Sequence, residues 1–209
     1  MPKLDFQFIL VLLAAVLPSL TIHEFAHALI AYKFGDNTAK SMGRLTLNPI
    51  AHIDILGTII LPLFFRFGYA KPVPVNFSVL KGWQILLVSL AGPISNICLA
   101  LILTVAYHIL PLQNLAIVKE FILIGVLINI VFAIFNLIPI PPLDGSRLVY
   151  ALLKSPRAKN IYRHFSQFGV FIIFGLIYLS ATGKYDVFSR VIDPVLRFFF
   201  NLLKLPRVL

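Results

Sequence analysis

The stretch that decides the fold is "LTIHEFAHALIAYKFG", residues Leu20 to Gly35, which sets two histidines and a glutamate inside an apolar run. Upstream, the run extends back through "FQFILVLLAAVLPS" without a break. Ionisable side chains are costly within a membrane, and where they occur there they generally serve function. The stretch therefore predicts a membrane-spanning helix that carries a chemical site.

The composition of the whole chain agrees with a membrane protein. Of the 209 residues, 59% are hydrophobic and only 12% are charged, whereas a water-soluble domain carries about 25% charged residues. The net charge of +10 comes from basic residues in short segments between apolar runs, without the aromatic–basic pattern of a nucleic-acid groove. We therefore expect these residues to face lipid headgroups, and we expect no nucleic-acid partner.

Four apolar runs are long enough to cross a bilayer core, which takes about 20 residues. They are Phe6–Ala31, Ile85–Leu110, Glu120–Ile138 and His164–Ala181. A shorter run, Asp54–Phe65, holds Gly57 and Pro62 and is better suited to a re-entrant segment. The tail Val187–Leu205 mixes charged and bulky apolar residues, as a helix lying in the membrane interface does.

These runs predict an all-α polytopic membrane protein with about four transmembrane helices. One small β element is expected, because "RLTLN" alternates polar and apolar residues before a turn-forming Asn-Pro pair. We expect residues 1–209 to form a single membrane-embedded domain, with a catalytic core at about 6–150 and accessory helices at 157–205. The N-terminal run continues into the histidine stretch, so we expect it to be retained and not cleaved as a signal.

The basic residues predict the orientation. Six lie between the first and second long runs and five between the third and fourth, provided that Asp54–Phe65 does not cross the bilayer. Positively charged loops lie on the cytoplasmic side of membranes. We therefore expect the N-terminus outside and the loops after His27 inside.

The motif "HEFAH" points to a metal. Residues i and i+4 share one face of a helix, so His23 and His27 can hold one zinc ion with Glu24 beside it. In the H-E-x-x-H pattern the glutamate acts as general base toward a water activated by zinc. Two histidines satisfied by backbone or water are the alternative, which carries less weight at membrane depth.

A catalytic zinc needs a third protein ligand and an open fourth position. The strongest candidate is Asp144 in "FNLIPIPPLDGSRL", because the three prolines before it prevent a regular helix and let the backbone bend inward. A turn-forming Asp-Gly pair at the membrane boundary is the alternative.

Other polar residues are candidates for substrate contacts. The amides of Asn96 and Asn136 are suited to stabilising an oxyanion, although an interhelical hydrogen bond is the alternative and is favoured for Asn96. His52 is a candidate for substrate binding, proton transfer or auxiliary ligation, with a plain interface histidine as the alternative.

Substrate geometry adds one further expectation. A peptide bond in a helix is shielded by that helix's own hydrogen bonds, so a spanning substrate must unwind before it is cut. An edge strand made of Leu45, Thr46 and Leu47 would accept such an unwound substrate as an added strand.

Three ordered motifs, "HEFAH", "AGPISN" (Ala91–Asn96) and "FNLIPIPPLDG" (Phe135–Gly145), together resemble the site-2 protease family of intramembrane zinc metalloproteases. The likeness is greatest to small prokaryotic members with "GRLTLNP" and "AKPVPVN" and without PDZ or CBS domains. The resemblance implies one Zn²⁺ per chain, held by His23, His27 and Asp144. It also implies Glu24 as the base and Asn136 close to the substrate or the oxyanion.

The expected function is that of an intramembrane zinc endopeptidase in the plasma membrane of a prokaryote. Its substrates would be transmembrane or signal-peptide-like segments, cut near the cytoplasmic face. The alternatives are a metal-binding or transport protein that uses the same site without hydrolysis, and a catalytically idle assembly factor. A Glu24→Gln variant separates these classes, because only a protease would lose turnover while keeping zinc.

Overall fold

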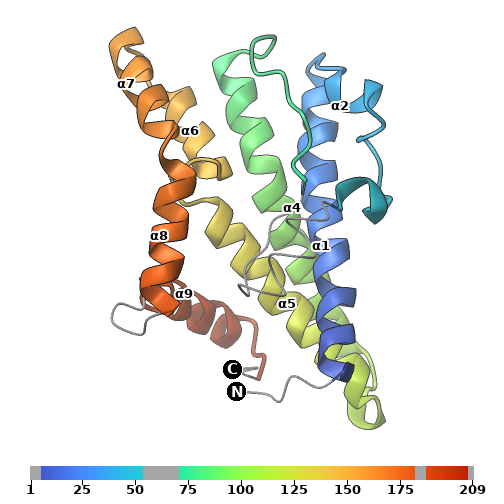
Figure 1. Ribbon diagram of the computed structural model, residues 1–209. Coiled ribbons are helices and arrows are strands. Elements are labelled where there is room, and N and C mark those ends of the chain that lie inside the picture. The colour runs from blue at the N-terminus through green and yellow to red at the C-terminus, as the bar shows by residue number, and fades with distance from the viewer. Residues whose placement is uncertain (1–5, 54–70, 182–186, 207–209) are drawn as a thin grey trace.

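The computed structural model describes residues 6–53, 71–181 and 187–206, and within these ranges it is a bundle of helices without a strand (Figure 1). In chain order the elements are α1 (Phe6–Lys33), α2 (Thr38–Ser41), η1 (Pro49–His52), α4 (Gly82–Ile109), η3 (Leu112–Asn114), α5 (Ala116–Asn136), α6 (Asp144–Leu152), α7 (Pro156–Ser166), α8 (Gly169–Ala181) and α9 (Val187–Leu202).

Helices α1, α4 and α5 pack pairwise against one another and form the body of the molecule. Each is long and apolar enough to cross a membrane. The helices α7 and α8, bent by 51° at a short break, pass the same test together, as one broken span or as a re-entrant loop. The first three predicted runs thus coincide with α1, α4 and α5 to within a few residues at each end, and a multi-pass helical membrane protein is confirmed.

The distribution of side chains is the reverse of that in a soluble protein. Leu13, Ile102 and Phe171 are 45%, 64% and 73% exposed on the outside of the bundle. By contrast, Asn96 and Asn129 are completely buried between the helices. Such an exterior is stable only where lipid is the solvent, while polar groups find partners in the interior.

The predicted strand at Leu45, Thr46 and Leu47 is wrong, because these residues form successive bends. Nearby side chains form hydrogen bonds with the backbone N–H and carbonyl groups that a neighbouring strand would otherwise bind. The ring of His52 donates to the Thr46 carbonyl at 2.9 Å, and the Thr46 hydroxyl accepts from the backbone N–H of Asn48 at 3.1 Å. The side chain of Asn48 in turn caps η1. The period-two pattern therefore belongs to a compact turn and supplies no strand edge for a substrate.

Residues 71–76, which form neither helix nor strand, run beside α1 and contact it, and we call this segment the proline strap. Its two prolines keep the backbone out of the helical region. Side chains hold both of its ends: Arg44 Nη2 donates to the Lys71 carbonyl at 2.6 Å, and Asp36 Oδ2 accepts from the Asn76 N–H at 2.7 Å. The strap is thereby fixed to the turn that follows α1, through Asp36, and to the segment that follows α2, through Arg44.

The anchor Asp36 is held ionised. Burial by itself would raise its pKa, but hydrogen bonds from Thr38 and from the Asn76 N–H outweigh burial and lower the pKa below its ordinary value. A carboxyl whose pKa is lowered on folding stabilises the fold above its unfolded pKa, and this contribution is lost as the pH falls through the folded pKa. The hydrogen bond between Asp36 and the strap is therefore fully formed at neutral pH and weakens only in acid.

The C-terminal helix α9 packs against α5 and α8. Phe200 and Leu205 join the apolar cluster of α4 and α5, and the His108 ring donates to the Leu203 carbonyl at 2.9 Å. Figure 1 places α9 and the start of α1 at one end of the bundle, and α2 and α7 at the other. The predicted re-entrant run Asp54–Phe65, with Gly57 and Pro62, lies outside the described residues.

Candidate metal centre

Two histidines lie one turn apart on the inner face of α1. His23 and His27 are 4% and 3% exposed, and their rings stand nearly at right angles, with an interplanar angle of 80°. Their Nε2 atoms are 3.1 Å apart. The i, i+4 spacing of the sequence thus brings one nitrogen from each ring to the same point.

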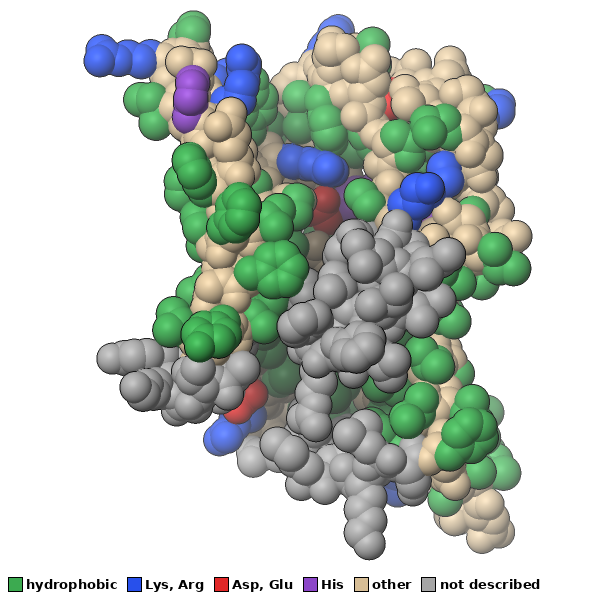
Figure 2. All heavy atoms as spheres, viewed as in Figure 1, with side chains coloured by type: hydrophobic (Ala, Val, Ile, Leu, Met, Phe, Trp, Pro, Cys, Tyr) green, Lys and Arg blue, Asp and Glu red, His purple; other side chains and the backbone are tan. Residues whose placement is uncertain are grey.

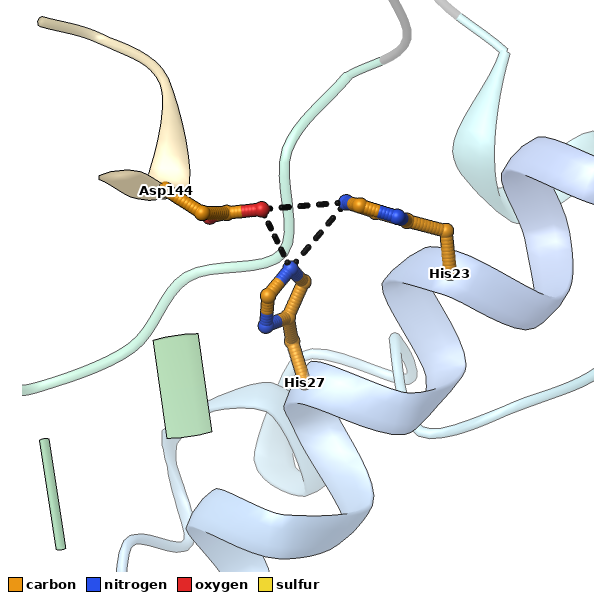
Figure 3. A group of neighbouring side chains, drawn as sticks. All are labelled: His23, His27 and Asp144. Atoms are coloured by element: carbon orange, nitrogen blue, oxygen red, sulfur yellow. Dashed lines mark hydrogen bonds and ion pairs between the residues drawn. The ribbon is translucent and has the colours of Figure 1, made fainter. Parts of the chain in front are cut away.

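Asp144 reaches this point from a distant part of the chain (Figure 3). It is the first residue of α6, and its Oδ2 lies 3.2 Å from His23 Nε2 and 3.0 Å from His27 Nε2. The turn between α5 and α6 depends on Gly145, where a Cβ would lie 2.2 Å from the Leu137 carbonyl oxygen. Only glycine lets the chain fold back this closely on the end of α5, which is what directs Asp144 inward.

The outer ring nitrogens determine which tautomer each histidine adopts. His23 Nδ1 lies 2.6 Å from Asn96 Oδ1, and His27 Nδ1 lies 2.6 Å from the Val88 carbonyl oxygen. Both oxygens can only accept, so each Nδ1 carries a hydrogen and donates it. Both Nε2 atoms are then available as metal ligands and face Asp144, the arrangement that outer-shell partners usually impose on ligand histidines.

Three acceptor atoms meeting in this way need a positive charge among them, either a proton or a metal ion. A tetrahedral zinc ion with bonds of about 2.0–2.1 Å holds its ligand atoms about 3.4 Å apart, close to the separations of 3.0 to 3.2 Å found here. Two histidines and one carboxylate also match a catalytic zinc site, in which three protein ligands leave a fourth position open. Within the described ranges, these three side chains make up the group suited to a metal.

Gly92 keeps space free beside these atoms. A Cβ on Gly92 would lie 2.3 Å from His27 Nε2 and 2.6 Å from His23 Nε2, inside van der Waals contact with both rings. Helix α4 can therefore approach the two nitrogens only because it has no side chain at this position. The "AGPISN" motif thus contributes a small residue directly at the candidate site.

The site favours the charged form of the Asp144 carboxyl. Burial would raise the pKa of Asp144, but the His27 and His23 rings beside it lower the pKa more, and it lies below its ordinary value. Arg147 Nη1 is 3.7 Å from Asp144 Oδ1, too far for a hydrogen bond. The carboxylate is therefore ionised and directed at the histidines, as a ligand to a divalent cation must be.

Glu24 lies between the two histidines in sequence and is 9% exposed. Its Oε2 accepts a hydrogen bond of 2.7 Å from the backbone N–H of Val73, in the proline strap. Because Pro72 and Pro74 have no N–H, Val73 is the one donor in this part of the strap. The strap thus orients the Glu24 carboxylate, a pairing for which the sequence offered no signal.

The remaining predicted site residues lie farther from the metal group. Asn96 contacts the group only indirectly, because its Oδ1 accepts a hydrogen bond from His23 Nδ1, the ring nitrogen that faces away from Asp144. Asn136 Nδ2 donates to the Phe132 carbonyl one turn back in α5 at 3.0 Å, and its role toward substrate stays a prediction. His52 is buried in η1 and bonded to Thr46. It does not join the group of ligands found among the described residues.

Comparisons with known proteins agree with this geometry. The family model described as "Peptidase family M50" matches residues 8–116 and 105–180. The chain is 42% identical over 183 residues to "Putative zinc metalloprotease YwhC" of Bacillus subtilis, covering 83% of this chain and 82% of that protein. It is 31% identical over 183 residues to "Putative zinc metalloprotease Rip2" of Mycolicibacterium smegmatis, covering 85% of this chain and 70% of that protein. No solved structure matches.

Most of the chain is therefore covered by a family model and by a relative well above 30% identity, and both point to zinc proteolysis. The buried His23, His27 and Asp144 group could hold the metal ion that such chemistry requires. The chain belongs to peptidase family M50, the site-2 protease family of intramembrane zinc proteases.

Proposed function

We propose that this chain is an endopeptidase that cuts transmembrane or signal-peptide-like segments near the cytoplasmic face of the plasma membrane. In this proposal His23, His27 and Asp144 hold one zinc ion and Glu24 is the catalytic base. The observation that carries the assignment is the convergence of three acceptor atoms within 3.2 Å of one another, with the outer nitrogens of both histidines occupied.

The chemistry divides between the metal and the protein. When bound, zinc supplies Lewis acidity toward water and toward the scissile carbonyl. Glu24 takes a proton from the attacking water and passes it to the leaving amine. The Val73 N–H holds one Glu24 oxygen, so that the carboxylate keeps a single orientation through both proton transfers.

A hollow on one face of the molecule is the proposed route of access to the site. Figure 2 shows histidine, acidic and basic side chains together in the hollow between the α7–α8 column and the rest of the bundle. A cavity of about 260 Å³ lies next to the start of α6, lined in part by Ser146, Arg147 and Tyr150. The rest of its lining is largely apolar, including Phe77 and Ile85, which supports entry of an unwound apolar substrate segment from the end of the bundle that carries α6 and α7.

The test is a Glu24→Gln variant, purified in detergent and also co-expressed with a single-span reporter that carries a signal-peptide-like segment. We expect wild-type zinc content of about one ion per chain, with cleavage reduced at least about 100-fold because the general base is missing. Zinc is measured by metal analysis and cleavage by the appearance of the shortened reporter.

Glu120→Gln is the matched control, since this carboxyl lies in the first turns of α5, remote in sequence from the metal group. It should leave both zinc content and cleavage unchanged. Normal cleavage by Glu24→Gln, or wild-type protein without stoichiometric zinc, would contradict the proposal.

A further inference from the structure

A buried chain of hydrogen bonds lies behind His23 and connects α1, α4 and α5. It consists of Ser19, Asn129 and Asn96, which are 1%, 0% and 0% exposed. Asn129 Nδ2 donates to Ser19 Oγ at 2.8 Å, Asn96 Nδ2 donates to Asn129 Oδ1 at 2.8 Å, and Asn96 Oδ1 meets His23 Nδ1 at 2.6 Å. Two amides fully buried at membrane depth are costly, and the proton transfers of the reaction do not use them.

The first part of this chain has a defined direction because backbone carbonyls fix it. The Ser19 hydroxyl donates to the Ala15 carbonyl at 2.7 Å, so its oxygen must accept from Asn129. Asn129 Nδ2 also donates to the Gly125 carbonyl at 2.8 Å. Two independent acceptors thus hold the NH₂ group of Asn129 toward α1 and its own backbone, and its Oδ1 is left to face α4.

The second part follows from the first. Since Asn129 presents an oxygen, Asn96 must present its NH₂ group, which also lies 3.3 Å from the Ser19 carbonyl. The remaining Asn96 oxygen then faces His23 Nδ1 and requires a hydrogen there. A side-chain amide is free to turn over unless its neighbours decide its orientation, and here they do.

We infer that Ser19 and Asn129 are positioning residues of the metal centre. They set the orientation of the Asn96 amide, and through it the tautomer that leaves His23 Nε2 available to the metal. The inference rests on the proposed role of His23 as a ligand. If the Asn96 amide turned over, its NH₂ group would face His23 Nδ1, the ring hydrogen would move to Nε2, and the ligand would be lost.

The two histidines differ in a way that explains why only one needs this support. His27 donates to the Val88 carbonyl, a backbone group that cannot turn over. His23 donates to a side-chain amide, whose two ends are nearly the same in shape and opposite in hydrogen bonding. The buried chain therefore serves the histidine whose tautomer would otherwise be undetermined.

The experiment uses the full-length protein in detergent and measures zinc affinity by chelator competition. We expect Asn129→Leu and Ser19→Ala to weaken zinc binding about 10- to 100-fold, the usual effect of losing an outer-shell partner. Thr21→Val is the matched control for Ser19→Ala, because Thr21 is a buried α1 residue whose hydroxyl donates only to its own helix, at the Leu17 carbonyl. It should bind zinc as the wild type does.

A rescue separates positioning from general loss of stability. A carboxyl group at position 96 offers His23 an acceptor oxygen in either orientation, so the Asn96→Asp/Asn129→Leu double variant should regain most of the lost affinity. The visible spectrum of the cobalt-loaded protein should change in Asn129→Leu and return toward that of the wild type in the double variant.

Three results would overturn the inference. If Asn129→Leu and Ser19→Ala bind zinc as tightly as a wild-type protein that holds one ion, Ser19 and Asn129 have no positioning role, and the proposed protease still stands. If the double variant shows no recovery, the loss is structural. A wild type without zinc would contradict the inference and the proposed function together.

Discussion

At Gly92, α4 passes close to the Nε2 atoms of His23 and His27, the proposed metal ligands, so we expect the site to require a residue without a side chain there. The Gly92→Ala variant would place a methyl group 2.3 Å from His27 Nε2 and 2.6 Å from His23 Nε2. We expect the rings to be displaced and zinc binding and cleavage to be lost. The helix itself should not suffer, since alanine is favoured over glycine in helices by about 1 kcal/mol. Metal analysis and thermal unfolding of the metal-free protein measure the two effects separately.

Gly175→Ala is the control for this prediction. Gly175 lies inside α8, and a Cβ there would meet nothing within 4 Å. The same substitution should therefore leave zinc content and cleavage intact. Stoichiometric zinc in Gly92→Ala would show that the rings can move aside, and that the close approach of α4 is not needed.

The positions of single site residues could be predicted where they depend on spacing along a short stretch of sequence. The histidine pair follows from an i, i+4 pattern, and the proline-rich turn before Asp144 indicated a carboxylate able to point inward. For Asn96 the interhelical alternative was the better one, since its amide bonds to α1 and α5. Asn129 was missed, because an asparagine in an apolar run signals a buried partner without revealing which one.

At the scale of elements, the long helices were predictable and the short connections were not. Apolar runs of about 20 residues have few alternatives in a membrane, so α1, α4 and α5 follow from composition. The strand prediction for "RLTLN" was wrong, because alternating polar and apolar residues form a strand only when a neighbouring strand pairs with them. Here His52 and Asn48 take the local backbone groups instead, and both contacts depend on the turn that the segment itself forms.

The proline strap is the element whose function is most open to test. In Val73→Pro the N–H that holds Glu24 is removed, whereas Val73→Ala shortens the same side chain and keeps that N–H. A hydrogen bond to a charged group is worth about 1.5–3 kcal/mol, so we expect cleavage to fall about 10- to 150-fold in the proline variant. Zinc content should stay at the wild-type level in both variants.

Both Val73 variants lose side-chain packing at a position that is 5% exposed, so a difference between them reports the loss of the N–H group alone. Equal cleavage by the two would show that the N–H is dispensable and that Glu24 is oriented by other groups. Loss of zinc in the proline variant alone would show instead that the strap supports the ligands and not the base.

At the scale of the whole molecule, the two ends of the bundle differ in how many basic residues they carry. Figure 1 places α2, α6 and α7 at one end and the start of α1 with α9 at the other. Basic residues concentrate in the segments of the first end, including Lys40 and Lys154. The turn between α4 and α5 contains η3 and has few charges. Because Asp144 begins α6, the metal group lies toward the basic end, which the charge distribution predicts to be cytoplasmic.

This orientation can be measured by labelling cysteines in intact cells with a membrane-impermeant maleimide, after Cys98→Ser removes the single native thiol. Lys40→Cys and Lys154→Cys should react only once the membrane is permeabilised, and Gln113→Cys should react from outside. All three positions are exposed, so accessibility reports the side of the membrane and not burial. Reaction of the two lysine positions from outside would place the metal group at the outer face, and substrates would then be cut there. Opposite results at Lys40 and Lys154 would mean that the chain between them crosses the bilayer an odd number of times, which α4 and α5 alone do not.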